Sequence, residues 1–271
     1  HRHQVSKIPP VRIQVTEYQL HTLRCPHCQA LTEASWPEGV SRRAFGPRVQ
    51  ALVSLLSGAY RLSKRQIQQL LSDGFRVEMA LGTVGQLEQV ISQALARPVE
   101  AAQAYVRGQE AKNVDETGWK EKGRRAWLWT AVTTWVSVFV IRFSRGSKVV
   151  RELLGEEVHG VVGSDRYSAY SFLDLSHRQV CWAHLRRDFQ KMIDRGGESA
   201  QIGEILLALT DQMFAWWHRV RDGTLKRKSF QRYLVDHKVR MHLYLWMGSQ
   251  CAHAKTARTC QEILSVEEAL W

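Results

Sequence analysis

The run Gly160-Val161-Val162-Gly163-Ser164-Asp165 predicts a short buried strand that ends on a carboxylate. Upstream, a strand is expected to begin at Asn113-Val114-Asp115, and two β-rich runs follow at 127–132 and 136–143. Turn residues at Glu121-Lys122-Gly123-Arg124 join the first two of these strands. The three upstream segments therefore predict a β-meander that precedes the buried strand.

Helices alternate with strands after the meander. A helical stretch at 148–154 precedes the buried strand, a fifth strand is expected at 178–182, and a long helix begins near His184. The order β-β-β-α-β-α-β-α predicts an α/β fold, with a mixed sheet on which helices pack. We assign this core to residues 106–203.

Two aspartates occupy special positions in this core, because Asp115 lies in its first strand and Asp165 ends the fourth. A sheet that places these strands side by side brings both carboxylates to one edge. Two adjacent carboxylates repel each other, and hard divalent ions such as Mg²⁺ relieve the repulsion by taking oxygen ligands. The pair predicts metal-assisted phosphoryl transfer, with two ions about 4 Å apart. Taken singly, each aspartate is explained as a turn or capping residue, so this prediction depends on the strand order.

Residues 1–40 are predicted to form a small β-rich piece around Cys25-Pro26-His27-Cys28. A structural zinc site needs four ligands, so Cys25 and Cys28 make half of a Zn²⁺ site, to which His21 or His27 can add a ligand. The alternative is a pair of unliganded thiols in a turn. The chain has five cysteines, an odd number that fits a reducing cytosol better than a disulfide framework.

Residues 41–105 are predicted to be helical, with short helices joined near Gly74. Such a pair suits a helix-turn-helix, and an ordinary helical bundle is the alternative. The cations Arg61, Lys64 and Arg65 at the helix entry can contact phosphates, which favours DNA binding.

Residues 204–250 are expected to form a basic helical insertion that contains Trp216 and Trp217. Its cations include Arg219, Arg221, Lys226, Arg227 and Lys228. Cationic helices with aromatic residues suit contacts to the DNA backbone. A solvated charged face with tryptophans in the core is the alternative explanation.

The overall composition agrees with a nucleic-acid partner. Lys and Arg number 38 against 26 Asp and Glu, a formal charge of +12 that favours polyanions. An apolar content of 44% excludes global disorder, and the length of 271 residues predicts two or three folding units. The most apolar stretch, 126–143, is interrupted by threonines and Arg142, so no membrane role is indicated.

Three ordered motifs carry a resemblance to a known family. They are Val114-Asp115-Glu116-Thr117-Gly118-Trp119, then residues 163–170 (Gly-Ser-Asp-Arg-Tyr-Ser-Ala-Tyr), and residues 181–189 (Cys-Trp-Ala-His-Leu-Arg-Arg-Asp-Phe). Together they resemble the core of transposases of the insertion sequence 66 family. The upstream segment from Arg2 to Cys28 is similar to the zinc-finger region of these proteins, so the resemblance spans nearly the whole chain.

The resemblance implies an RNase H-like fold and the aspartate-aspartate-glutamate mechanism. Carboxylate-bound Mg²⁺ or Mn²⁺ then directs water, and later a DNA 3′-hydroxyl, at a phosphodiester. Asp115 and Asp165 match the first two acidic positions of the family. The implied partners are the terminal inverted repeats of the element, target DNA, further copies of the chain on DNA, and accessory transposition proteins. The implied location is the bacterial cytoplasm, in association with the nucleoid.

The sequence also departs from the family pattern. The third acid of the family follows a paired Asn, whereas Asn113 is the only asparagine of this chain. Three glutamates lie in the right region without that context, and none is assigned: Glu262, Glu267 and Glu268. We expect the third acid beyond Trp271, with 251–271 as the start of the returning core segment, and the other half of the zinc site before His1.

These departures lead us to expect that the chain is an incomplete fragment of a transposase, inactive by itself, and they leave two alternatives. One is a DNA-binding remnant without catalysis, because two carboxylates hold metal ions less well than three. The other is a nuclease of the same fold that acts on RNA.

Two further features follow the second aspartate. The spacing Cys181-x-x-His184 resembles a signature of several transposase families, and a partial zinc site is one interpretation. The favoured one is a buried cysteine at a strand end with a histidine at a helix start. Arg186 and Arg187 on that helix are predicted phosphate contacts, because a guanidinium matches phosphate geometry.

Overall fold

The computed structural model describes residues 1–9, 11 and 13–271, and it divides the chain into two compact units, His1–Pro98 and Val99–Trp271. Pro10 and Arg12, which belong to the upstream segment of the resemblance, lie outside the described residues. In the part of the chain that is described, no helix is long and apolar enough to cross a membrane.

The first unit begins with a two-stranded hairpin. Strand β1 (Thr22–Arg24) pairs antiparallel with β2 (Leu31–Glu33), and all six residues are exposed. The cysteine pair lies in the turn between them, where the Cys25 N–H donates to the Ala30 carbonyl at 2.8 Å. The predicted β-rich piece is therefore a hairpin with little buried surface of its own.

Three helices follow in this unit: α1 (Pro47–Gly58), α2 (Lys64–Phe75) and α3 (Leu81–Ala94). Their buried faces share a core that includes Val53, Ile67 and Val84. Helix α2 begins at a capping box, in which Ser63 and Gln66 each bond the other's backbone N–H. Helix α2 contains Gly74 and continues to Phe75, and Arg76 follows in a left-handed conformation. The connection to α3 therefore begins at Arg76, two residues after Gly74, where the sequence predicts it.

The second unit contains the predicted mixed sheet. Its strands are β3 (Ala111–Glu121), β4 (Arg124–Val132), β5 (Ser137–Arg142), β6 (Val161–Ser164) and β7 (Arg178–Val180). The order is β5-β4-β3-β6-β7, with the first three strands antiparallel and β6 and β7 parallel to β3. The β-meander and the neighbouring strands of the aspartates are thus confirmed.

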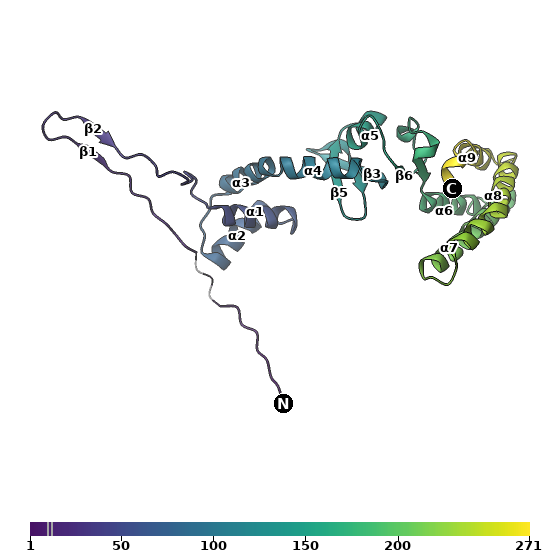
Figure 1. The fold of residues 1–271 in the computed structure, drawn as a ribbon, viewed down its shortest axis with the longest axis horizontal. Coiled ribbons are helices and arrows are strands. Elements are labelled where there is room, and N and C mark those ends of the chain that lie inside the picture. The colour runs from purple at the N-terminus through teal and green to yellow at the C-terminus, as the bar shows by residue number, and fades with distance from the viewer. Residues whose placement is uncertain (10, 12) are drawn as a thin grey trace. The chain divides into compact units, whose positions relative to one another are not determined.

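Helices accompany this sheet along the chain (Figure 1). They are α4 (Ala96–Arg107), α5 (Ser147–Leu154), α6 (Trp182–Ile193), α7 (Gly197–Arg221), α8 (Arg227–Ser249) and α9 (Ala254–Leu264). Short 3₁₀ turns lie at η1 (Ser168–Tyr170), η2 (Leu175–His177) and η3 (Glu267–Leu270).

Two predicted boundaries differ from the structure. The expected division at residue 203 falls inside α7, which runs unbroken because no proline or internal turn interrupts 197–221. The expected division at residue 105 falls inside α4, and the compact units separate at Pro98 instead.

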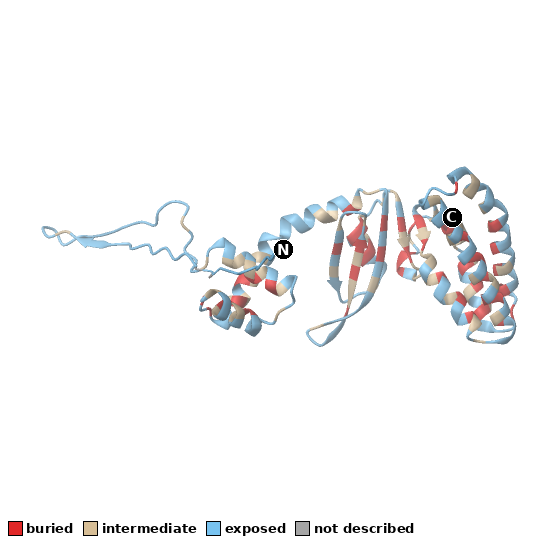
Figure 2. Ribbon diagram, turned by 90° about the horizontal axis from the view of Figure 1, so that it is seen from below, coloured by how far each residue is buried: buried red, intermediate tan, exposed pale blue. Residues whose placement is uncertain are grey.

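The sheet buries one face and leaves the other open. Val114, Trp129 and Val162 form a core with α5, which covers this face. The residues of β3 that point to the other face, such as Asn113 and Asp115, are exposed, and Phe139 of β5 on the same face is 59% exposed. Figure 2 shows buried and exposed residues alternating along the strands of the sheet. A second core joins β7 to the helices α6 to α9.

Candidate functional site

The sheet brings Asp115 and Asp165 onto neighbouring segments of the chain. Strands β3 and β6 pair in parallel, with Ala111 opposite Val161 and Asn113 opposite Gly163, where the paired register ends. Asp115 follows two residues later within β3, and Asp165 lies one residue past the end of β6. Asp115 is exposed on the open face of the sheet, because its neighbours Val114 and Glu116 point to the covered face, and Asp165 is half-buried.

The two strands approach closely just before the carboxylates. A Cβ placed on Gly163 would lie 2.2 Å from Oδ1 of Asn113. The asparagine side chain therefore occupies the space that any larger residue at position 163 would need. Gly163 thus leaves room for the Asn113 side chain to lie across the last paired residues of β3 and β6.

Backbone contacts hold Asp165 in place. Its Oδ1 accepts a hydrogen bond from the Tyr167 N–H at 2.8 Å, and its carbonyl accepts one from Nη2 of buried Arg178 at 2.8 Å. Burial lowers the pKa of Arg178, an effect that the negative charge of Asp165 opposes. Asp165, directly after β6, is thus held through both its side chain and its main chain.

A buried network connects the strands that carry the two acids. The Glu116 side chain is 1% exposed and accepts from the Tyr170 hydroxyl at 2.6 Å and from Nη2 of Arg145 at 2.7 Å. The Arg145 guanidinium also lies 3.9 Å from the ring centroid of Tyr167. Because Tyr167 binds Asp165, this network links the residue next to Asp115 with the loop that holds Asp165. We name Glu116, Arg145, Tyr167 and Tyr170 the support network.

Electrostatics keep the tyrosine of this network protonated. Burial raises the pKa of Tyr170 strongly, and the hydrogen bond to Glu116 raises it further. The negative charges of Asp165 and Asp115 act in the same direction, which agrees with the proximity of both carboxylates. Tyr170 is therefore a permanent donor to Glu116 at physiological pH.

A polar cavity of about 460 Å³ lies beside Asp165. It is lined by Asp165, Arg166, Tyr167, His184, Arg187, Asp188, Lys191 and Glu262. Of the two predicted phosphate contacts on α6, Arg187 lines this cavity, whereas Arg186 forms an ion pair with Asp211 of α7. Sequence reasoning missed Lys191, although it lies one helical turn after Arg187 on the same face.

Glu262 reaches this cavity from α9, far along the chain. Its Oε2 pairs with Nη1 of Arg166 at 3.1 Å, and its Oε1 accepts from Nε of Arg258 at 2.9 Å. Both carboxylate oxygens therefore bind guanidinium groups, which compete with a metal ion for the same lone pairs. This pairing agrees with leaving Glu262 unassigned as a third acid.

The oxygen donors of Asp115 and Asp165 suit a hard divalent ion. Across residues 1–9, 11 and 13–271, however, no cluster of three or more His, Cys, Asp or Glu side chains is arranged to hold a metal. Cys181 is the N-cap residue of α6, and the His184 N–H donates to its carbonyl at 3.0 Å, but the cysteine is half-buried, whereas the sequence predicts a buried one. The turn at Cys25 lowers the pKa of that thiol, chiefly through the backbone N–H of Cys28.

The other predicted cations differ in their surroundings. Arg61 lies exposed in the turn before α2, and Arg65 is exposed on that helix. Lys64 pairs instead with Glu88 of α3 at 3.3 Å, so it contributes to packing within the unit. The exposed cations Lys226, Arg227 and Lys228 gather at the turn between α7 and α8.

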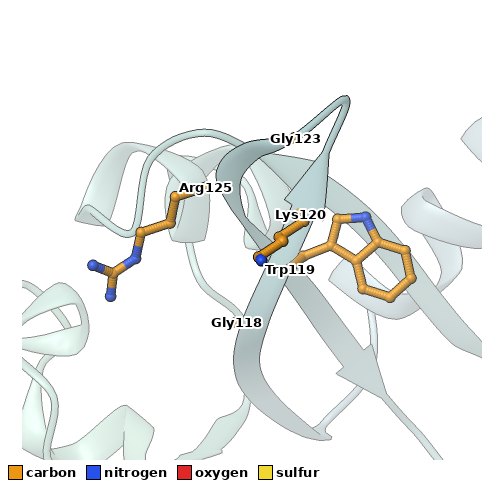
Figure 3. A pocket seen from close by; sticks show the side chains of 5 residues that line it. All are labelled: Gly118, Trp119, Lys120, Gly123 and Arg125. Atoms are coloured by element: carbon orange, nitrogen blue, oxygen red, sulfur yellow. The ribbon is translucent and has the colours of Figure 1, made fainter.

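The hairpin of β3 and β4 carries a further basic surface that the sequence prediction treated only as a turn. A cavity of about 600 Å³ is lined by Gly118, Trp119, Lys120, Gly123 and Arg125. Lys120 and Arg125 are cross-strand partners. Trp119 is 43% exposed, and its side chain projects to the opposite side of the hairpin from Arg125 (Figure 3). The alternation of Trp119 with the cations of this hairpin is the feature of the sequence that could have predicted this basic surface.

Comparison with known proteins gives one finding. Residues 42–271, well over half of the chain, match the model of the family described as Transposase IS66 family. No curated protein matches the chain.

Proposed function

The chain belongs to the IS66 transposase family, and from this premise we propose that it cuts DNA at the ends of an insertion sequence and joins them to a target strand. The observation that supports the proposal is the parallel pairing of β3 and β6, whose register ends at Asn113 and Gly163, two residues before Asp115 and Asp165. The central position of these two strands in a five-stranded mixed sheet supports an RNase H-like core.

In this proposal Asp115 and Asp165 hold Mg²⁺ or Mn²⁺ through their carboxylate oxygens. The bound ions supply the positive charge that activates the attacking oxygen and stabilises the leaving one. The support network holds both carboxylates through backbone groups, because the Tyr167 N–H donates to Oδ1 of Asp165 at 2.8 Å and the Glu116 N–H donates to Oδ1 of Asp115 at 3.0 Å. Arg187 and Lys191 bind a DNA phosphate in the cavity beside Asp165.

Surrounding cations bind the rest of the DNA by charge. These DNA contacts are three groups of exposed cations: Lys120 and Arg125 of the hairpin, residues 226–228 at the α7–α8 turn, and Arg61 and Arg65. The half zinc site at Cys25 and Cys28 and the helices of the first unit serve recognition of the terminal repeats. The proposal also includes assembly of several copies of the chain on DNA and the help of accessory proteins. It places the protein at the bacterial nucleoid.

The decisive experiment is a nicking assay on DNA that carries the ends of the element, with and without Mg²⁺. Asp115→Asn and Asp165→Asn remove a metal-binding oxygen without changing the shape of the side chain. We expect each to lower the rate by more than about 100-fold, since loss of a mere supporting residue costs 10–100-fold. The matched control is Asp222→Asn, which changes an exposed aspartate at the end of α7. Equal nicking by wild type and Asp115→Asn would contradict the catalytic assignment.

One observation favours a second candidate, a DNA-binding protein without catalysis. Glu262, which lines the cavity with Asp165, is bound by Arg166 and Arg258, so both of its carboxylate oxygens are already engaged. This candidate predicts salt-sensitive DNA binding by residues 1–271 with no turnover. Turnover by this chain at rates abolished by Asp165→Asn excludes it.

A further inference from the structure

A second cavity lies between α7 and α8, and it shares no residue with the cavity beside Asp165. Its volume is about 400 Å³, and it is lined by Gln212, Trp216, Arg219, Tyr233, Asp236, His237 and Arg240. The helices α7 and α8 run side by side here (Figure 1). The cavity has an aromatic side, a buried polar group and a cationic rim, and these point to one kind of ligand.

Three rings form the aromatic side, with Trp216 in contact with both Tyr233 and His237. The ring centroid of Trp216 lies 5.2 Å from that of Tyr233 and 5.3 Å from that of His237. Tyr233 is 42% exposed, so the group is open to solvent at one end. Flat aromatic surfaces of this kind stack nucleobases without regard to sequence, because every base has a π-face.

His237 supplies the buried polar group. It is 2% exposed, and neither ring nitrogen has a partner in hydrogen-bonding geometry among the described residues, although the Leu209 carbonyl lies near the ring. Buried polar atoms without partners are rare in folded proteins, and a ligand that enters the cavity can satisfy them. Neutral imidazole offers one donor and one acceptor, the same combination that the edge of a nucleobase presents.

The rim carries charges of both signs with a positive excess. Arg219 and Arg240 are exposed, and a guanidinium binds phosphate with two parallel N–H donors. The Asp236 carboxylate accepts from an exocyclic amino group, and the Gln212 amide both donates and accepts. A free phosphate uses the arginines alone, whereas a nucleotide uses the rings, the polar edges and the arginines together.

A chain of aromatic contacts joins this cavity to the start of α6. The ring centroids of Trp182 and Trp271 are 5.4 Å apart, and those of Trp271 and His237 are 6.3 Å apart. Trp182 precedes by two residues His184, which lines the cavity beside Asp165. Trp182 and Trp271 thus connect the packing around the second cavity with helix α6, which lines the cavity beside Asp165.

We propose that the α7–α8 cavity receives one unpaired nucleotide of the DNA strand, with its base against Trp216 and its phosphate on Arg219 and Arg240. The inference rests on the proposed function, because it takes the DNA from there. Extraction of a base from the duplex costs stacking and pairing energy. Stacking of the base on the aromatic rings of the cavity offsets part of this cost. The cavity thus favours DNA whose end is already opened.

The test compares two oligonucleotide probes on the purified full chain, a perfect duplex and the same duplex with one unpaired 2-aminopurine. Fluorescence anisotropy gives the affinity, and quenching of 2-aminopurine reports stacking. We expect the unpaired probe to bind about 10-fold more tightly and to be quenched. Trp216→Ala should remove both effects, and Arg240→Gln, an exposed substitution that leaves the helix core intact, should reduce the affinity difference.

Two matched controls lie on the same helix. Trp217→Ala removes a 41% exposed tryptophan that contacts Phe230 instead of the cavity, and Arg221→Gln removes a neighbouring cation. Both should keep the preference for the unpaired probe.

The outcomes separate the inference from the proposed function. Salt-sensitive binding of both probes with equal affinity, or a preference that survives Trp216→Ala, overturns the nucleotide cavity and leaves the proposed function standing. Competition by inorganic phosphate that is unchanged in Trp216→Ala shows a simple anion site and also overturns the inference. Failure to bind either probe overturns both proposals.

Discussion

At the scale of single residues, the acids depend on side chains that the local sequence does not connect with them. Glu116 follows Asp115 directly, yet its partners Arg145 and Tyr170 lie 29 and 54 residues further along the chain. A carboxylate that is 1% exposed requires such partners, because an unpaired buried charge is strongly destabilising. The support network therefore stabilises the fold and directs the acids at the same time.

Glu116→Gln tests the second role. The amide keeps the volume of the side chain but weakens the bonds to Tyr170 and Arg145. We expect nicking to fall about 10–100-fold and the Mg²⁺ concentration for half-maximal activity to rise. The matched control is Glu121→Gln at the end of β3. A lower rate with an unchanged Mg²⁺ requirement would show that Glu116 acts only on stability.

Gly163→Ala tests the close approach of β3 and β6. The new methyl group collides with Oδ1 of Asn113, and we expect a loss of about 1–3 kcal/mol in the free energy of unfolding. Asn113→Ala in the same chain should restore most of it. Gly118→Ala, which meets no atom within 4 Å, is the control and should change stability by less than about 0.5 kcal/mol. Urea unfolding followed by near-ultraviolet circular dichroism measures all three, and equal losses for positions 163 and 118 would refute the packing argument.

At the scale of elements, the sequence predicted the strands well because each has a local pattern. The meander follows from β-rich runs separated by turn residues. Asp165 directly follows β6, whereas Asp115 lies inside β3, which begins two residues before the predicted start at Asn113. The pairing of Glu262 with Arg166, 96 residues apart, has no local signal. The predicted division at 203 lies where the basic, tryptophan-containing segment begins. Helix α7 continues across this position and ends at Arg221, before the turn to α8.

The packing of α7 against α8 predicts a pH dependence. Burial lowers the pKa of His237 below its ordinary value of 6.5, with a smaller effect in the same direction from Arg240 and an opposing one from the Leu209 carbonyl. The unfolded chain therefore binds the proton first, so stability is complete above about pH 6.5 and falls as the pH drops toward the lower folded pKa. His237→Leu should flatten this fall in thermal denaturation between pH 7 and pH 5. His218→Gln, an exposed change on α7, should leave the curve as it is. An identical pH profile in His237→Leu would contradict the assignment.

At the scale of the whole molecule, the charge of +12 makes DNA binding sensitive to salt. Replacement of Lys226, Arg227 and Lys228 by glutamine removes three exposed cations from the α7–α8 turn. We expect the slope of log affinity against log salt to decrease by up to about 2.7, at about 0.9 for each phosphate contact. Arg142→Gln, which removes a cation already paired with Glu152, is the control. A slope unchanged by the triple substitution would remove this turn from the DNA contacts.

The link between Arg166 and Glu262 also has a consequence for the order of events during translation. Asp165 leaves the ribosome well before α9 does, because Glu262 lies 96 residues after Arg166. At a synthesis rate of about 5–20 residues per second, the delay is about 5–20 s. Throughout that interval Arg166 lacks one of its two acidic partners, and the wall of the cavity is incomplete. The nascent chain therefore contains Asp165 before the cavity beside it has received the side chain of Glu262.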